Sequence, residues 1–306
     1  MATNDARDLA ITIDRDRLKE IYQPEWLRLV LDLLLDWGVI ILSAWLALAY
    51  LNLLTYILAV IVIGARMHAL AVLMHDVSHF RFLNNRKLGD FIINLFVCWP
   101  MFVTVAKYRA NHLKHHQHLN TSEDPDWIAK ESHPAFKHPQ TRWQFLLRLF
   151  TYLIGVQGIR DVVWIFKRLS KQGKVKGKRE YGGIIFNLGL FAALTVFEFW
   201  VPYLLFWIVP FFTTLLMFQY IRSFAEHFGD LEYDNLYHSI RTVNPNLIER
   251  FFIAPHNISY HMEHHLYPGV PYHNLPKLKA LLMTDESYRV NAHYTDGYLS
   301  GLLREL

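Results

Sequence analysis

Four long apolar runs dominate the sequence. Residues 33–51 and 53–74 form one pair of runs, and residues 182–201 and 202–221 form a second pair. Each run has about 20 residues, and a helix of that length crosses roughly 30 Å, the thickness of the hydrocarbon core of a bilayer. We therefore expect an all-α integral membrane protein in which four transmembrane helices form two hairpins.

The distribution of charge orients these hairpins. The turns expected at residues 51–54 and 200–203 contain no charged side chain, whereas residues 75–181 and 222–306 hold most of the Lys and Arg residues. Basic loops stay on the cytoplasmic side of a membrane. The pattern predicts a multi-pass protein whose termini and central segment face the cytoplasm. The densest basic cluster, interpreted as a solvated loop beside anionic headgroups, comprises Lys167, Arg168, Lys171, Lys174, Lys176, Lys178 and Arg179.

We expect the whole chain, residues 1–306, to form a single domain. A cytoplasmic arm (1–32) precedes the first hairpin (33–74), a cytoplasmic and interfacial segment (75–181) precedes the second hairpin (182–221), and a cytoplasmic cap (222–306) follows. Two further apolar stretches, 88–105 and 145–166, carry charged residues. We interpret them as helices that lie in the interface or re-enter the bilayer.

The composition excludes several classes of function. The 31 Lys and Arg residues against 27 Asp and Glu residues give a net charge of +4, which is too small to indicate nucleic-acid binding. Cys98 is the only cysteine, so the chain contains no disulfide, no CxxC zinc site and no cysteine-ligated iron–sulfur cluster.

The sequence contains three histidine clusters, the first directly after the second apolar run. The first is His75–His79 (HxxxH), the second is His112–His116 (HxxHH), and the third is His261–His265 (HxxHH). Residues three and four apart share one face of a helix, so each cluster presents two or three imidazoles in one direction. Imidazole is a good ligand for iron and zinc.

The positions of the clusters restrict the topology. With four crossings, and with neither doubtful stretch crossing, all three clusters face the cytoplasm. If residues 88–105 and 145–166 both crossed, the second cluster would lie alone across roughly 30 Å of hydrocarbon. A shared metal site and a four-span topology therefore support each other.

The sequence resembles the membrane-bound fatty acid desaturase/hydroxylase superfamily. The resemblance covers about residues 66–282 and rests on HDVSH, on NHLKHH followed by NTSEDPDW, on EHFG, and on NISYHMEHHLYPGVPYHNLP. It implies a centre of two iron ions that uses O2 to remove hydrogens from an acyl chain. Carried over position by position, the implied ligands are His75, His79, His112, His115, His116, His261, His264 and His265, with His227 as the ninth.

The sequence departs from two branches of this superfamily. Ser223 stands where the stearoyl-CoA branch has an Asn, and the first cluster has three intervening residues where that branch has four. His261 stands where the front-end branch has Gln, and the sequence contains no HPGG haem motif. Acyl-lipid, sphingolipid-like and carotenoid-like branches remain open.

Polar residues beside the clusters are candidates to orient the imidazoles through their second ring nitrogen. They could equally cap helices or face solvent, and a structural role is open for His68, which lies two turns before His75. His133 is expected in a loop or at the surface. The candidates are Asp76, Asp124, Asp126, Glu226, Asn257, Glu263, His68 and His256.

The resulting hypothesis is an acyl-lipid desaturase that inserts a cis double bond. The sequence has no flavin fingerprint, haem motif or cysteine cluster, so electrons must come from an external ferredoxin, rubredoxin or cytochrome b5, which we expect on the basic face. A lipid or carotenoid hydroxylase or ketolase on the same scaffold is one alternative. A histidine-rich metal transporter is another, but it predicts ligands near the bilayer midplane.

Overall fold

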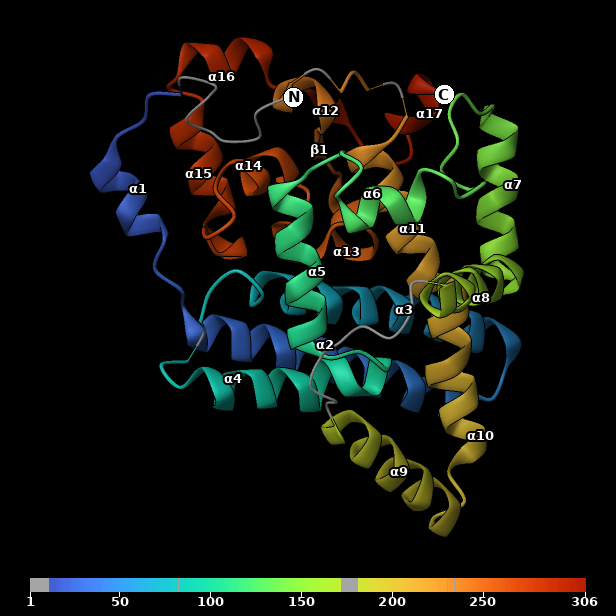
Figure 1. Cartoon of the computed structure of the whole chain (residues 1–306). Helices are drawn as coiled ribbons and strands as arrows, with labels where there is room; N and C mark the ends of the chain where they lie inside the picture. Colours follow the sequence, from blue (N-terminus) through green and yellow to red (C-terminus); the bar gives the residue numbers. More distant parts are fainter. Residues whose placement is uncertain (1–10, 82, 172–180, 230, 234) are drawn as a thin grey trace.

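The computed structural model describes residues 11–81, 83–171, 181–229, 231–233 and 235–306 (Figure 1). Over these residues the structure is almost wholly helical, and its one sheet has two short parallel strands, β1 and β2. The elements are α1 (Arg15–Ile21), α2 (Trp26–Tyr50), α3 (Leu53–Asp76), α4 (Arg86–Ile93), η1 (Asn94–Cys98), η2 (Trp99–Met101), α5 (Val105–Gln117), α6 (Pro125–Lys130), α7 (Arg142–Leu153), α8 (Val156–Lys171), α9 (Tyr181–Val196), α10 (Trp200–Tyr203), η3 (Leu204–Ile208), η4 (Phe211–Leu215), α11 (Leu216–His227), α12 (Leu236–Ser239), β1 (Thr242–Asn244), α13 (Leu247–Phe252), η5 (Pro255–Asn257), α14 (His261–Leu266), η6 (Tyr272–Asn274), α15 (Leu275–Leu282), α16 (Glu286–Asn291), β2 (Tyr294–Asp296) and α17 (Leu302–Glu305).

The first apolar pair forms a helical hairpin. Helix α2 ends at Leu51, which has a left-handed backbone with φ 44°, and Asn52 caps α3 by accepting a hydrogen bond from the backbone N–H of Thr55. Helix α3 is mostly buried, whereas α2 exposes many large apolar side chains. This exposed apolar surface is typical of a helix that faces lipid.

The second apolar pair differs from the expected hairpin. Helix α9 has only 16 residues, about 24 Å, because the chain turns at residues 197–199, where Glu198 has φ 56°. The turn therefore lies just before the expected position at 200–203. The following helix is continuous from Trp200 to His227 over 28 residues and includes the π-helical turns η3 and η4.

Three helices of the described chain are long and apolar enough to cross a membrane, namely Trp26–Tyr50, Leu53–Asp76 and Trp200–His227. The segments Arg86–Met101 and Val105–Gln117 are long and apolar enough to cross a membrane only if they are taken together as one span, and the chain bends by 87° between them. The bend falls where Phe102 has φ 60° and Thr104 caps α5. The expected interfacial stretch 88–105 is thus the first arm of this pair.

The stretch 145–166 forms two helices instead of one. Helix α7 ends before Gly155, which has φ 79°, and α8 then runs in a new direction (Figure 1). Glycine adopts this left-handed backbone without strain, so it allows the sharp turn. Much of the basic cluster at 167–179 lies outside the described residues, which resume at Tyr181.

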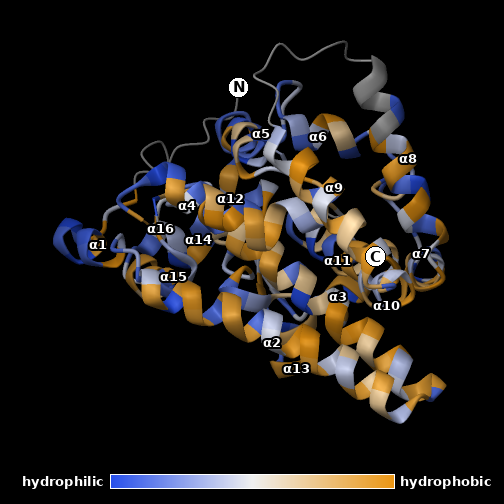
Figure 2. Ribbon diagram, turned by 90° about the horizontal axis from the view of Figure 1, so that it is seen from below, coloured by the Kyte–Doolittle hydropathy of each residue, from blue (hydrophilic) through white to orange (hydrophobic). Residues whose placement is uncertain are grey.

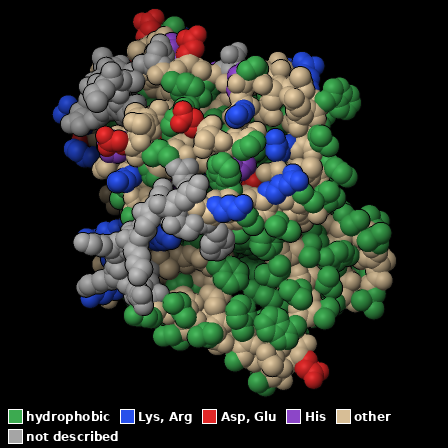
Figure 3. Space-filling view, turned by 45° about the vertical axis from the view of Figure 1, so that its right-hand side comes forward, with side chains coloured by type: hydrophobic (Ala, Val, Ile, Leu, Met, Phe, Trp, Pro, Cys, Tyr) green, Lys and Arg blue, Asp and Glu red, His purple; other side chains and the backbone are tan. Residues whose placement is uncertain are grey.

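Hydrophobic and charged surfaces lie on different parts of the molecule. Hydrophobic side chains gather over the lower part of the face in Figure 3, below a row of Lys and Arg side chains. The ribbon of α2 is mostly hydrophobic, whereas that of α1 is mostly hydrophilic (Figure 2). The C-terminal segment, from α12 to α17, packs at the polar end together with α5 and α6 (Figure 1).

Buried polar contacts connect this C-terminal segment to the first hairpin. Asp36 of α2 pairs with Arg66 of α3 at 3.1 Å, and His256 Nε2 lies 2.8 Å from the other oxygen of Asp36. The Tyr272 hydroxyl donates to Asp32. Charged groups are costly in an apolar region unless they are paired, so this network fixes the register between the hairpin and the segment above it.

Helix α3 approaches η4 most closely at Gly64. A Cβ atom at this position would lie 2.0 Å from Thr214 Oγ1 and 2.8 Å from the backbone nitrogen of Leu215. We predict that Gly64→Ala lowers the free energy of unfolding by about 1–3 kcal/mol, because the two helices must separate. The measurement is the thermal unfolding midpoint of the detergent-solubilised protein.

The matched control is Gly38→Ala in α2, where a Cβ atom would meet nothing within 4 Å. This variant should keep or slightly raise Tm, because Ala is a better helix former than Gly. Equal Tm values for the two variants would contradict the close packing at Gly64.

Candidate metal centre

Nine histidines from four separate parts of the chain meet above the apolar helices. They come from the end of α3 and the turn after it, from α5, from the last residue of α11, and from α14. One group consists of His75, His79, His112, His116 and His264, and a second consists of two triads that share His227: His115, His227 and His265, and Glu226, His227 and His261. In each set the possible ligand atoms lie within 4.8 Å of one another.

Individual distances show how tightly the imidazoles converge. In the first group, His116 Nε2 lies 3.1 Å from both His112 Nε2 and His264 Nε2. In the second, His261 Nε2 lies 2.7 Å from His227 Nε2. The rings of His116 and His265 stack with centroids 4.3 Å apart, so the two groups are adjacent.

The buried rings offer free lone pairs. Burial lowers the pKa values of His261, His264 and His265 well below the usual imidazole range, so these rings are uncharged at neutral pH. Both ring nitrogens of His75 and Nε2 of His265 are buried without a hydrogen-bond partner in the described chain. Such atoms are costly to bury, and a bound cation would satisfy them.

Two of the predicted carboxylates contact these histidines. Asp124 Oδ2 lies 2.9 Å from His115 Nδ1, and the same carboxylate caps α6. Glu226 Oε2 lies 3.4 Å from His261 Nδ1. A carboxylate on one ring nitrogen fixes the ring orientation and leaves the other nitrogen free to bind a metal.

Three other predicted carboxylate and amide groups make different contacts. Asp76 accepts from the backbone N–H of Tyr272 at 3.0 Å, and Asn257 donates to the carbonyl of the same residue at 3.2 Å. Glu263 accepts from the hydroxyl of Thr242. Adjacent positions on a helix point about 100° apart, so Asp76 and Glu263 turn away from the imidazoles beside them.

The remaining candidates also serve local contacts. Asp126 lies 3.4 Å from Lys130 Nζ. His68 Nε2 lies 3.1 Å from the carbonyl of Ile253, and His256 binds Asp36 in the network described above. His68 and His256 therefore connect the hairpin to the C-terminal segment.

Arg222 and Tyr298 complete the surroundings of Glu226, and the sequence analysis missed both. Arg222 Nε donates to Glu226 at 2.8 Å, and the Tyr298 hydroxyl donates at 2.9 Å. The i,i+4 spacing of Arg222 and Glu226 was a usable signal. Tyr298 lies 72 residues from Glu226 along the chain, so only the tertiary structure reveals its role.

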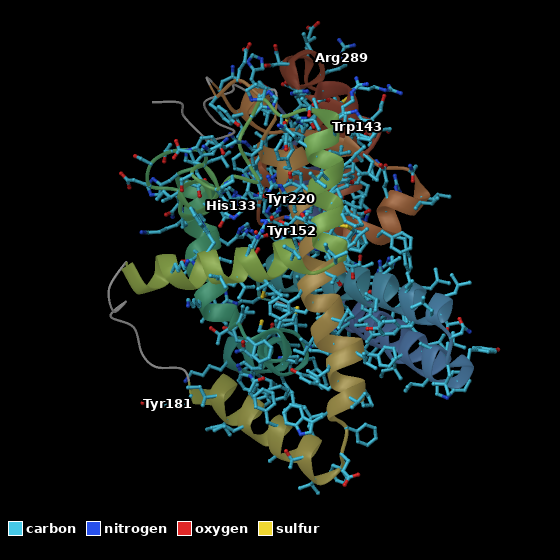
Figure 4. The ribbon with its side chains drawn as sticks, turned by 90° about the vertical axis from the view of Figure 1, so that its right-hand side faces the viewer. His133, Trp143, Tyr152, Tyr181, Tyr220 and Arg289 are labelled. Carbon is cyan, nitrogen blue, oxygen red and sulfur yellow. The ribbon has the colours of Figure 1, made fainter. Side chains whose placement is uncertain are left out.

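A cavity of about 290 Å³ opens onto the histidines. Its walls come from α3, α5, α6, α7, α8 and α11, and they include aromatic and charged side chains. His133, which was expected in a loop or at the surface, lies in the loop between α6 and α7, lines this cavity and is buried. It lies with Tyr152 and Tyr220 where α7, α8 and α11 meet (Figure 4).

Comparison with known proteins supports the resemblance found in the sequence. The model of the fatty acid desaturase family matches residues 51–298. The chain is 29% identical to dihydrorhizobitoxine desaturase of Bradyrhizobium elkanii over 245 residues, which covers 76% of this chain and 69% of that protein.

Two lipid desaturases are also similar. Identity is 26% to the sn-1 oleoyl-lipid 12-desaturase of Anabaena variabilis, covering 69% of this chain and 64% of the relative. It is 26% to the omega-3 fatty acid desaturase of the endoplasmic reticulum from Vigna radiata var. radiata, covering 69% and 60%. The chain thus spans less than two thirds of the length of these two relatives.

We predict that His264→Ala lowers the content of bound transition metal, because His264 shares the first group with four other imidazoles. The measurement is metal analysis of the purified protein by mass spectrometry, with two ions per chain expected for the unchanged protein. His138→Ala, which removes an exposed histidine, is the control. An unchanged metal content in His264→Ala would contradict the assignment of this group.

Proposed function

Because the chain belongs to the fatty acid desaturase family, we propose that it is an O2-dependent membrane desaturase with a centre of two iron ions. The convergence of nine imidazoles in two adjacent groups carries this proposal. The reaction removes two hydrogens from neighbouring carbons of a lipid acyl chain or a related substrate and leaves a cis double bond. Two electrons from a donor and two protons complete the reduction of O2 to water.

The first iron would be held by His75, His79, His112, His116 and His264, and the second by His115, His227, His261 and His265. Imidazole ligands suit iron, and the uncharged rings leave such a centre strongly cationic. When bound, the two ions would supply the activation of O2, which protein side chains alone do not provide.

The chain itself contributes orientation and exclusion of water. Asp124 hydrogen-bonds to His115 Nδ1 and so fixes the nitrogen that this ring presents to the centre, and Glu226 lies 3.4 Å from His261 Nδ1, on the corresponding side of that ring. His261 and His264 are almost fully buried, and the cavity is the route by which a substrate could reach them. A site that excludes water protects reactive species from side reactions.

We place four spans in the membrane, with the metal centre and both termini in the cytoplasm. The uncharged turns near residues 51–54 and 197–203 and the basic segments 75–181 and 222–306 support this orientation. Helix α9 would provide the fourth span although it is short. Local thinning of the bilayer can accommodate such a mismatch.

The electron donor is an external protein in this proposal. A ferredoxin, a rubredoxin or a cytochrome b5 would meet the basic cytoplasmic face, and pairing of opposite charges would make the rate of electron transfer depend on salt.

The mass of the product distinguishes the possible reactions. We predict that membranes with the unchanged protein, supplied with O2 and a reductant system, form a product two mass units lighter than its substrate. A gain of sixteen units would instead identify a hydroxylase on the same scaffold. The measurement is mass spectrometry of lipid and aqueous extracts. His115→Ala, which loses an imidazole that Asp124 orients, should form no product, whereas His138→Ala should retain activity.

A further inference from the structure

The cavity beside the histidines has an outer wall that the desaturase chemistry does not use. One end is formed by histidines of the metal centre, and the other by residues of α6, α7 and α8. Three carboxylates and two basic side chains line it: Asp126, Asp161, Glu226, Lys130 and Arg222. A cavity that received only a hydrocarbon chain would not need charged walls.

Two pairs of these charges neutralise each other. Lys130 Nζ lies 3.4 Å from Asp126 Oδ2, and Arg222 Nε lies 2.8 Å from Glu226 Oε2. One carboxylate of the lining, Asp161, remains outside these pairs. The lining therefore has a net negative charge, and this charge is located on α8.

The partners that the structure gives Asp161 in the described chain are a tyrosine, a glutamine and a histidine, with no Lys or Arg among them. The Tyr152 hydroxyl and the Gln157 amide each donate to it at 2.5 Å, and His133 Nε2 lies 3.4 Å from its Oδ1. His133 Nδ1 accepts from the backbone N–H of Ala135 at 3.2 Å, which leaves Nε2 as the ring nitrogen that faces Asp161. Tyr152, Gln157 and His133 thus hold the carboxylate in place at this end of the cavity.

A basic group near this end, Arg148, does not pair with Asp161. Arg148 Nη1 donates to Gln157 Oε1 at 3.2 Å, one amide away from the carboxylate, and Arg148 does not line the cavity. No described Lys or Arg side chain pairs with Asp161, so its negative charge is left to a cation that enters the cavity.

Aromatic rings surround the same end. Tyr152 and Tyr220 lie with ring centroids 5.3 Å apart, Phe136 lies 5.3 Å from Tyr220, and Trp164 lies 5.1 Å from the ring of His133. Trp164 Nε1 is buried with no hydrogen-bond partner in the described part of the chain. Aromatic faces next to a carboxylate are the typical recognition site for an ammonium group.

We propose that this outer end binds a cationic amine of the substrate against Asp161, so that the substrate is a compact amine-bearing molecule. The inference rests on the proposed desaturase function and names its substrate class. The volume of about 290 Å³ lies at the lower limit for pockets that enclose small ligands. The amine could belong to a free metabolite or to the head group of a lipid.

Helix α11 lines the cavity from the aromatic rings to the histidines. Tyr220, which contacts Tyr152, and His227 lie two turns apart on α11, which corresponds to about 10 Å. Cations held by uncharged histidines would repel an ammonium group. The substrate would therefore enter with its amine at Asp161 and its alkyl part towards the histidines.

The test compares three probes of equal chain length on the iron-loaded full chain in an uncharged detergent. Octan-1-amine is cationic at neutral pH, octan-1-ol is neutral, and octanoate is anionic. We expect the amine to bind roughly 10–100-fold more tightly than the alcohol, as a charge-assisted hydrogen bond provides, and octanoate to bind most weakly. The measurement is isothermal titration calorimetry. Equal affinity for the three probes, or preference for the alcohol or octanoate, would overturn the inference.

Variants at Asp161 locate the preference. Asp161→Asn should lose the preference for octan-1-amine over octan-1-ol, and Asp161→Glu should retain most of this preference because the negative charge remains. Glu131→Gln, which neutralises an exposed carboxylate that does not line the cavity, is the matched control and should bind the amine unchanged. An amine preference that persists in a folded Asp161→Asn would contradict the assignment. If Asp161→Asn does not fold, the affinities of the unchanged protein for the three probes decide whether the inference holds.

Product analysis separates this inference from the proposed function. Amine-bearing dehydrogenated products in the aqueous extract identify a free metabolite, and those in the lipid extract identify a head group; either supports the inference. Dehydrogenated products without an amine would overturn the inference and leave the desaturase function intact. Amine binding without any dehydrogenated product would overturn the function and leave the site intact.

Discussion

The structure depends on bringing uncharged imidazoles from distant parts of the chain into one buried place. The groups draw on the end of α3, on α5, on the end of α11 and on α14, so a shift of any one element would separate the rings. Metal–imidazole bonds of roughly 2 Å tolerate little displacement. The packing of the apolar helices and of the segment above them therefore decides whether these rings can share a metal ion.

Buried polar contacts provide much of this positional control. The network of Asp36, Arg66 and His256 connects α2 and α3 to the segment that carries α14, and Asp124 and Glu226 hold individual rings. Each of these groups would be costly to bury alone. When these groups are paired, they stabilise one arrangement of the helices. A purely apolar interface would allow the helices to slide and would specify their arrangement less sharply.

The sequence predicted most of the site and less of the fold. Spacing within HxxxH and HxxHH put eight imidazoles on shared helix faces, the family resemblance added His227, and the structure brings these nine side chains together. The sequence did not predict that α9 would end before Glu198, because the left-handed backbone of this one residue decides where the helix ends. The sequence predicted a loop or surface position for His133; the residue does lie in a loop, but its burial was not predictable because it depends on α7 and α8, which pack from elsewhere in the chain.

Local chemistry and periodicity by themselves determined the long apolar helices, the histidine clusters and the family, since these properties reside in neighbouring residues. Only the tertiary structure decided which histidines share a group, which carboxylates support them, and which charges line the cavity. Asp161 shows the reason. Its sequence neighbours do not distinguish it from any other acidic residue on a helix, and it becomes distinctive only when Tyr152 and His133 surround it and the basic side chains of the lining pair with other carboxylates.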